Sequence, residues 1–224
     1  MNEYRDSSGK RLVDYPRPSV TVDTATLTVR DDQLMVALIA TAANKGSELG
    51  KFQLPGTFLW EGETLAGAVH RSLIDKVDGA DWVPEQLRVF DDPNRDPRGW
   101  VLTVAHVLVA PTAAFGKGVQ FVPVTQAIGL SYDHDQILRL AVDRLRQQYR
   151  ERPDPSKLLG DKFTLNELQQ LHAAIDPALP KRDTFRRGML EHLVAVKGVR
   201  KGVVGKPAQL YRRKKSDVSV TAKD

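Results

Sequence analysis

The sequence of 224 residues contains no cysteine. A disulfide framework and a cysteine-ligated zinc site are therefore both excluded. The sequence also has no apolar run that approaches the length needed to cross a membrane. The N-terminal stretch MNEYRDSSGKRLVDYPRP is polar and has no apolar core, so we expect neither a signal peptide nor a membrane anchor. Together these absences predict a cytoplasmic protein.

Acidic residues are scarce in the last third of the chain. Residues 151–224 contain 16 Lys+Arg against 9 Asp+Glu, a net charge of +7, whereas residues 1–150 contain 17 against 19, a net charge of −2. A basic segment joined to a near-neutral body is typical of a nucleic-acid-binding module attached to another domain. We predict a polar arm at 1–17, a first domain at 18–150, a linker at 151–160, a basic domain at 161–215 and a tail at 216–224.

The first domain is predicted to combine strands and helices. β-Branched residues fill 20–29, a turn follows at 31–32, and 34–40 returns as a second strand of a hairpin. Further strand-like runs lie at 87–90, 100–110 and 119–123, and apolar residues recur at helical spacing over 133–149. This order of elements predicts an α/β fold in which helices cover a mixed sheet.

Residues 54–79, LPGTFLWEGETLAGAVHRSLIDKVDG, resemble the Nudix box. That box is the loop and helix that hold magnesium in hydrolases of nucleoside diphosphates linked to another group, with the pattern G-x5-E-x7-R-E-U-x-E-E-x-G-U, where U is a bulky aliphatic residue. The chain retains Pro55, Gly56, Gly62, Glu63, Arg71 and Leu73 in register. It replaces the later glutamates by Ser72, Asp75 and Lys76, and two glycines by Thr57 and Asp78. The resemblance implies a Nudix α/β/α sandwich that no longer hydrolyses its ligand.

Ser72 and Lys76 are four residues apart, so they lie on the one face of the predicted helix where the metal would bind. Magnesium prefers several oxygen ligands, usually carboxylates with phosphate and water, and neither side chain supplies a carboxylate. The Lys76 ammonium would repel a divalent cation and would partly balance a bound phosphate. We therefore expect no catalytic residue, no metal and no cofactor. The alternative is an ordinary amphipathic helix whose apolar stripe starts at Leu65 and Val69.

Residues 91–99, DDPNRDPRG, are predicted to form a loop because they are rich in proline and charge. Arg95 and Arg98 are suited to bind a pyrophosphate, since planar guanidinium groups match phosphate oxygens in pairs. The alternative is a solvated loop whose arginines pair with its own aspartates. The residues alone leave both interpretations open, and the resemblance of RDPRG to Nudix proteins that handle ADP-ribose favours the ligand-binding one.

The basic domain is predicted to be a helix-turn-helix with a wing. Thr164 and Glu167 form a capping box at the start of an amphipathic helix that ends before Asp176. A second helix begins near residue 184, capped by Asp183 or Thr184. Strand-like runs at 194–199 and 209–213 enclose a basic tip. The alternative is a small helical dimerisation module with a solvated basic tail.

A recognition helix reads the major groove mainly with its first turns, and a basic wing tip contacts phosphates. The candidate DNA-binding residues on the helix are Lys181, Arg182, Thr184, Arg186 and Arg187. Those on the wing are Arg200 and Lys201.

The box, RDPRG, SYDHDQIL, FTLNELQQLHAAI, KRDTFRRGML and GKPAQLYRR together resemble the NrtR family of Nudix-related transcriptional regulators, over nearly the whole chain. The resemblance implies a repressor of genes for NAD synthesis or salvage that is dimeric through its Nudix domains and binds a palindromic operator. It implies ADP-ribose as effector, bound near Glu63, Arg71, Arg95 and Arg98 with Lys76 close by. The family's DNA-contacting arginines map onto Arg186 and Arg187, and its GRPA turn onto residues 205–208, which include Lys206.

Two other functions remain open. One is an active, magnesium-dependent Nudix pyrophosphatase that acts on ADP-ribose-like substrates, and the other is an adaptor in which both domains bind proteins. If the chain is a regulator, we expect an effector to shift the spacing of the two wings, with residues 133–149 and the linker coupling the domains.

Overall fold

The computed structural model describes residues 4–40, 52–77, 82–112, 115, 119–200 and 207–214. The helices are α1 (Leu65–Val77), α2 (His134–Glu151), α3 (Leu165–Ile175) and α4 (Arg182–Leu190), preceded by a 3-10 turn, η1 (Leu12–Asp14). The strands are β1 (Ser19–Arg30), β2 (Gln33–Ala40), β3 (Phe52–Gln53), β4 (Gly56–Phe58), β5 (Glu85–Phe90), β6 (Val101–Val109), β7 (Gln120–Pro123), β8 (Phe163–Thr164), β9 (Leu193–Arg200) and β10 (Ala208–Arg213). Among the described residues, no helix combines the length and apolarity needed to cross a bilayer.

The first domain is built on a mixed sheet with strand order β3-β2-β1-β6-β5, to which β4 adds beside β1 and β7 beside β2. β1 runs parallel to β6 and antiparallel to β2, so the predicted hairpin is confirmed. Eight consecutive residues of β1 are buried, as expected for a strand covered on both faces.

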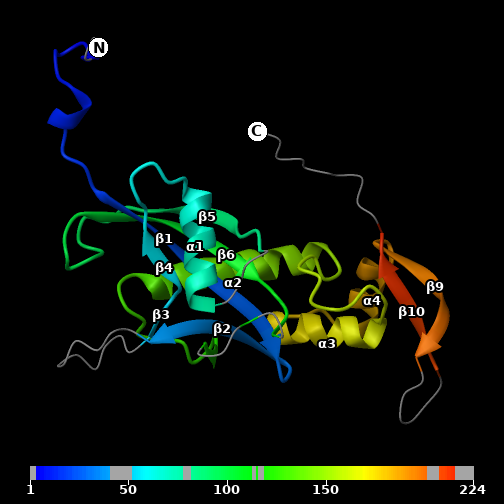
Figure 1. Cartoon of the computed structure of the whole chain (residues 1–224). Coiled ribbons are helices and arrows are strands. Elements are labelled where there is room, and N and C mark those ends of the chain that lie inside the picture. The colour runs from blue at the N-terminus through cyan, green and yellow to red at the C-terminus, as the bar shows by residue number, and fades with distance from the viewer. Residues whose placement is uncertain are drawn as a thin grey trace.

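Helices cover both faces of this sheet. Val104 and Leu108 of β6 pack with α1, whereas Ala105 and Val107 of the same strand pack with α2. Because successive side chains of a strand point to opposite faces, α1 and α2 lie on opposite sides of the sheet. The predicted α/β/α sandwich is therefore confirmed, and Figure 1 shows its layers.

The basic domain is a winged helix of α3, α4 and a sheet of order β8-β10-β9. The capping box predicted for α3 is present: the Glu167 amide donates to Thr164 Oγ1 and the Thr164 amide to Glu167 Oε2. The cap predicted for α4 is wrong. The amide of Phe185 bonds to the carbonyl of Lys181, so Lys181 is the N-cap and Asp183 and Thr184 lie within the first turn.

The segment expected as a linker is packed between the two domains. α2 continues to Glu151, and the side chain of Asp154 is fully buried. α3 belongs to both cores, since Leu171 and Ile175 pack in the core of the first domain while Leu168 packs in that of the winged helix. Figure 1 shows α2 and α3 side by side between the mixed sheet and the wing strands. The domains are therefore joined by shared packing.

Candidate functional site

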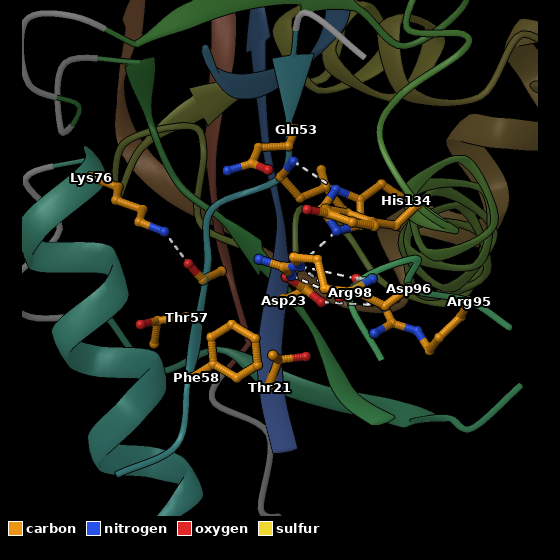
Figure 2. Close-up of a pocket in the computed structure, with 13 residues that line it drawn as sticks. Thr21, Asp23, Gln53, Thr57, Phe58, Lys76, Arg95, Asp96, Arg98 and His134 are labelled. Atoms are coloured by element: carbon orange, nitrogen blue, oxygen red, sulfur yellow. Dashed lines mark hydrogen bonds and ion pairs between the residues drawn. The ribbon is translucent and has the colours of Figure 1, made fainter. Parts of the chain in front are cut away.

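A pocket of about 220 Å³ opens beside the centre of the mixed sheet. Its walls come from β1, the segment around β4, the end of α1, the loop 91–99 and the start of α2, as Figure 2 shows. Its lining includes Asp23, Phe58, Lys76, Arg95, Asp96, Arg98, Tyr132 and His134. The pocket therefore combines three cations, two buried carboxylates and the aromatic rings of Phe58 and Tyr132.

Asp23 is a buried carboxylate on the central strand of the sheet. Burial alone would raise its pKa, but the His134 ring, Thr103 and Arg95 together outweigh burial and lower the pKa of Asp23. Asp23 is therefore ionised at neutral pH. A Cβ on Gly56 would lie 1.9 Å from Asp23 Oδ1, so the glycine of the Pro-Gly turn is required for the loop to approach this carboxylate.

His134, the first residue of α2, is oriented by hydrogen bonds on both sides. The amide of Leu54 donates to its Nδ1 at 3.1 Å, and its Nε2 lies 3.5 Å from Asp23 Oδ1. Since Nδ1 accepts, the proton resides on Nε2 and faces the carboxylate. His134 therefore ties the start of α2 to both β1 and the loop before β4.

The two arginines of the 91–99 loop have different environments. Arg95 is buried and makes a two-pronged ion pair with Asp133, at 2.8 Å from Nε and 2.6 Å from Nη2, and lies 3.6 Å from Asp23. Arg98 pairs with Asp96 but leaves 54% of its side chain exposed. The prediction of pairing within the loop thus describes Arg98, whereas Arg95 reaches Asp133 at the N-cap of α2.

Arg98 also lies over two aromatic rings that flank the pocket. Its guanidinium carbon is 5.1 Å from the centre of the Phe58 ring and 5.0 Å from that of Tyr132. Such contacts hold a guanidinium group at an aromatic face, while Nε and Nη2 of Arg98 donate to Asp96. The pocket mouth therefore carries a positive group between two rings.

Lys76 enters the pocket from α1 and donates a hydrogen bond to the carbonyl of Gly56 (Figure 2). Burial lowers the pKa of Lys76, while Asp23 and Asp75 oppose that shift. Ser72, one turn earlier, is buried, and its hydroxyl has no hydrogen-bond partner among the described residues. The helix face on which the box carries glutamates thus presents an ammonium and an isolated hydroxyl.

Glu63 and Arg71 lie outside the residues that line this pocket. They pair with each other at 2.9 and 2.8 Å, and Arg71 also donates to Thr57 Oγ1 and to the carbonyl of Phe58. The hydrogen bond from Arg71 is the main reason that the pKa of Glu63 falls to about 2. Together they brace the loop against α1, and Trp60 stacks on the outer face of Arg71 at 3.7 Å.

The sequence-based search missed Asp23, His134, Tyr132 and Gln53, which all line the pocket. One signal was available, because Asp23 is a lone carboxylate within the apolar, β-branched stretch VTVDTATLTV. A charged residue in a strand that reads as buried needs a partner or a function. His134 lies in the segment SYDHDQIL, but no local pattern gave it a role in the site, since its partners lie 80 and 111 positions earlier in the chain.

The predicted DNA-binding side chains of α4 share one property. All are exposed, and none makes a hydrogen bond or ion pair with another side chain in the described ranges: Lys181, Arg182, Thr184, Arg186 and Arg187. Arg200 of β9 instead forms an ion pair with Glu167 and donates to the carbonyl of Lys162. The predicted wing residues Lys201 and Lys206, with the rest of the tip, lie outside the described residues. Helix α4 therefore presents positive charges that are exposed and that have no acidic partner among the described residues.

Comparison with known proteins begins with the winged helix. Residues 155–213 match the family model described as the NrtR DNA-binding winged helix domain. Over 210 residues the chain is 33% identical to the ADPR responsive transcriptional repressor NtrR of Acinetobacter baylyi, which covers 89% of this chain and 83% of the relative. The chain belongs to the NrtR family.

Solved NrtR structures have the same architecture. Shewanella oneidensis NrtR in complex with a 27mer DNA is 30% identical, with a TM-score of 0.72 over 87% of this chain and 93% of that one. The Nudix domain of the same protein in complex with ADP ribose is 28% identical, with a TM-score of 0.53 over 62% of this chain and 95% of that one. The NrtR likeness therefore extends over both domains.

A catalytic relative matches the first domain. An ADP-ribose pyrophosphatase of Methanocaldococcus jannaschii is 29% identical over 140 residues, which are 60% of this chain and 78% of that protein. The chain is thus similar both to a regulator and, over 60% of its length, to an enzyme.

Proposed function

We propose that this chain is a transcriptional repressor that binds DNA through its winged helix and senses a nucleotide in its Nudix pocket. The observation that carries the proposal is the similarity to a repressor over 89% of the chain, joined to a helix α4 whose exposed arginines have no carboxylate partner in the described part of the chain. We place α4 in the major groove, with Arg186 and Arg187 as its main contacts. The operator is palindromic, and two chains bind it as a dimer held by their Nudix domains.

The regulated genes are those of NAD synthesis or salvage, and the effector is ADP-ribose or a close analogue. The Nudix domain of a relative is solved in complex with ADP ribose, and the chemistry of the pocket suits the same ligand. Arg98 and Lys76 provide positive charge for a pyrophosphate. Asp23 supplies a carboxylate that accepts hydrogen bonds from ribose hydroxyls, and Phe58 provides an aromatic face for a base.

The pocket is proposed to bind its ligand without cleaving it. Magnesium, which the Nudix fold implies, does not fit the residues on α1, because Lys76 supplies an ammonium and Ser72 a buried, unpartnered hydroxyl. Among the described residues, no group of three or more His, Asp or Glu side chains is arranged to hold a metal ion. These observations support a sensor.

A magnesium-dependent pyrophosphatase is the alternative, since the first domain is similar to such an enzyme. Incubation of the protein with ADP-ribose and magnesium, followed by separation of AMP and ribose phosphate, distinguishes the two. We expect ADP-ribose to bind, as measured by calorimetry, and to be recovered intact. Turnover at a rate ordinary for an enzyme would contradict the sensor proposal.

DNA binding is tested by a gel shift with the region upstream of the chain's own gene. We expect a shift that weakens steeply with salt, with a log-log slope of about −0.9 for each phosphate neutralised. Addition of ADP-ribose should change the affinity. A neighbouring gene for an enzyme or transporter of NAD metabolism would identify the target, and absence of any sequence-selective shift would contradict the assignment.

A further inference from the structure

The fully buried carboxylate of Asp154 binds two parts of the molecule at once. Its Oδ1 accepts from the Tyr149 hydroxyl and from the amide of Leu158, both at 2.8 Å. Its Oδ2 accepts from the amide of Leu159 at 2.8 Å and forms an ion pair with Arg213 of β10. Asp154 therefore joins the last turn of α2 to the base of the wing.

Arg213 is held by several acceptors of the segment that follows α2. Its guanidinium group donates to the carbonyl of Asp154 at 3.0 Å and to that of Leu159 at 2.9 Å, in addition to the Asp154 carboxylate. Asp154 itself has a φ of 47°, in the left-handed region that few residues other than glycine adopt at low cost. Such a conformation persists where its surroundings fix it, and here the hydrogen bonds of the carboxylate and of Arg213 do so.

Tyr149 makes a second connection with its ring. The ring packs edge-on against His172 of α3 with 4.9 Å between centroids, and His172 packs in the same way against Phe185 of α4 at 5.0 Å. Burial, together with the charge of Asp154, raises the pKa of the Tyr149 hydroxyl well above its ordinary value, so the hydroxyl stays protonated and donates. Tyr149 is thus linked to the wing through the hydrogen bond of its hydroxyl to Asp154. It is linked to the recognition helix through the contact of its ring with His172.

The other end of α2 lies in the wall of the nucleotide pocket. Its N-cap Asp133 holds Arg95, and its first residue His134 faces Asp23. The helix has 18 residues, about 27 Å at 1.5 Å per residue, and a packed helix of this length moves as a unit. A displacement at the pocket therefore reaches Tyr149.

We propose that Tyr149 and Asp154 form a joint through which α2 fixes the orientation of the winged helix and, on the function proposed above, carries the response to the bound nucleotide. Apolar packing alone tolerates sliding, whereas a buried carboxylate with several directed donors is satisfied in one arrangement. Asp154 and Tyr149 are positioning residues in this scheme. They touch neither the pocket lining described above nor the exposed face of α4.

The orientation is measurable because the chain has no cysteine. Ala66→Cys on α1 and Ala195→Cys on β9 replace exposed alanines and supply two spin labels, diluted with unlabelled protein so that distances within one chain dominate. Pulsed electron–electron double resonance then gives the distribution of distances between the two labels, and so between the domains. We expect Tyr149→Phe, which keeps the ring and removes the hydroxyl, to broaden or shift that distribution.

The matched control is Tyr211→Phe in β10. Tyr211 lies in the same wing sheet, and its hydroxyl has no hydrogen-bond partner within the described ranges, so this variant should keep the parent distribution. Asp154→Asn, which retains the shape of the side chain, should perturb the distance more than Tyr149→Phe. If Tyr149→Phe and Tyr211→Phe give the same distribution as the parent, the joint is disproved, whatever the stability of Asp154→Asn.

The response to nucleotide is measured separately. In Tyr149→Phe we expect unchanged affinity for ADP-ribose, while the factor by which ADP-ribose alters DNA affinity falls by about fivefold, the factor that one net hydrogen bond contributes. A full response in Tyr149→Phe would overturn the transmission part of the proposal. A parent protein that binds neither DNA nor ADP-ribose would instead refute the proposed function, and the distance measurement would still decide whether the joint exists.

Discussion

The nucleotide pocket with its Nudix loop and the recognition helix α4 both carry several arginines, but the two regions treat them differently. Each arginine of the first region is held by a carboxylate of the chain: Arg71 by Glu63, Arg95 by Asp133 and Arg98 by Asp96. The arginines of α4 are exposed and have no acidic partner in the described part of the chain. The arginines of the pocket and the Nudix loop are therefore paired with carboxylates, whereas those of α4 are not.

This difference matches two kinds of ligand. A nucleotide in the pocket competes with carboxylates that already bind the arginines. It binds tightly only if its phosphate oxygens take over the hydrogen bonds of those carboxylates, and this requirement favours selectivity. A DNA phosphate that meets α4 displaces only water and mobile ions, which favours fast association and strong salt dependence.

Removal of free charge from α4 should have the largest effect. We expect Arg186→Ala with Arg187→Ala to weaken specific DNA binding by about 2–6 kcal/mol, because each good arginine contact to a base contributes about 1–3 kcal/mol. If the two arginines bind phosphates instead, the salt slope should flatten by about 1.8. Gel shifts or fluorescence anisotropy over a range of salt concentrations measure both quantities.

The matched control is Arg17→Ala with Arg139→Ala, which removes the same charge from exposed positions outside the winged helix. This variant should keep nearly all specific affinity. Equal losses in the two double variants would mean that net charge, and not the placement of charge on α4, determines binding.

Removal of a committed charge should instead damage folding. Arg95→Ala leaves the buried Asp23 and the half-buried Asp133 without their shared guanidinium partner. We expect the free energy of unfolding to fall by about 3–5 kcal/mol, as for other buried ion pairs that lose one partner. Urea titration followed by circular dichroism measures the loss, and a change below about 1 kcal/mol would show that Arg95 is not a structural cation.

The elements set by short-range pattern could be predicted from the sequence. The β1–β2 hairpin follows from its β-branched residues and turn signal, and α2 and α3 follow from helical periodicity. The capping box of Thr164 and Glu167 follows from an end signal within a few residues. The cap of α4 was wrong by two or three positions, because a good capping residue in the sequence does not force the helix to begin there.

The partners of the charged residues could not be predicted in the same way. The distance in sequence is 38 residues between Arg95 and Asp133 and 59 between Arg213 and Asp154, and only the fold brings such pairs together. Asp154 lies between Pro153 and Pro155, in a segment whose composition indicates a solvated linker, yet it is fully buried. The composition of the segment does not indicate that a distant arginine pairs with Asp154 and so allows its carboxylate to be buried.

His172 is a buried, titratable residue of α3. Its effect on stability contrasts with that of the exposed arginines of α4. Burial lowers the pKa of His172 from 6.5 to about 4. The unfolded chain therefore takes up a proton as pH falls from 6.5 to about 4 while the folded chain does not, so stability is complete above this window and decreases through it. The shift corresponds to about 3 kcal/mol.

We expect His172→Gln to lose this component of acid sensitivity, measured as the difference between unfolding free energies at the two ends of the window. Other groups titrate in both proteins, so the comparison between parent and variant isolates His172. Equal pH dependence in the two proteins would mean that His172 takes up its proton at the same pH in the folded and the unfolded chain. The exposed arginines of α4 should contribute nothing to this difference.

The smallest effect is expected for Arg98→Ala, which separates the two arginines of one loop. Arg98 leaves 54% of its side chain exposed, against 3% for Arg95, so its loss should change the free energy of unfolding by less than about 1 kcal/mol. If Arg98 binds the pyrophosphate, the affinity for ADP-ribose should fall about tenfold, in line with about 1.5 kcal/mol for a hydrogen bond to a charged group. Calorimetric titration measures this loss. Unchanged affinity would leave Lys76 as the pocket's phosphate ligand and would mean that Arg98 serves only its pairing with Asp96.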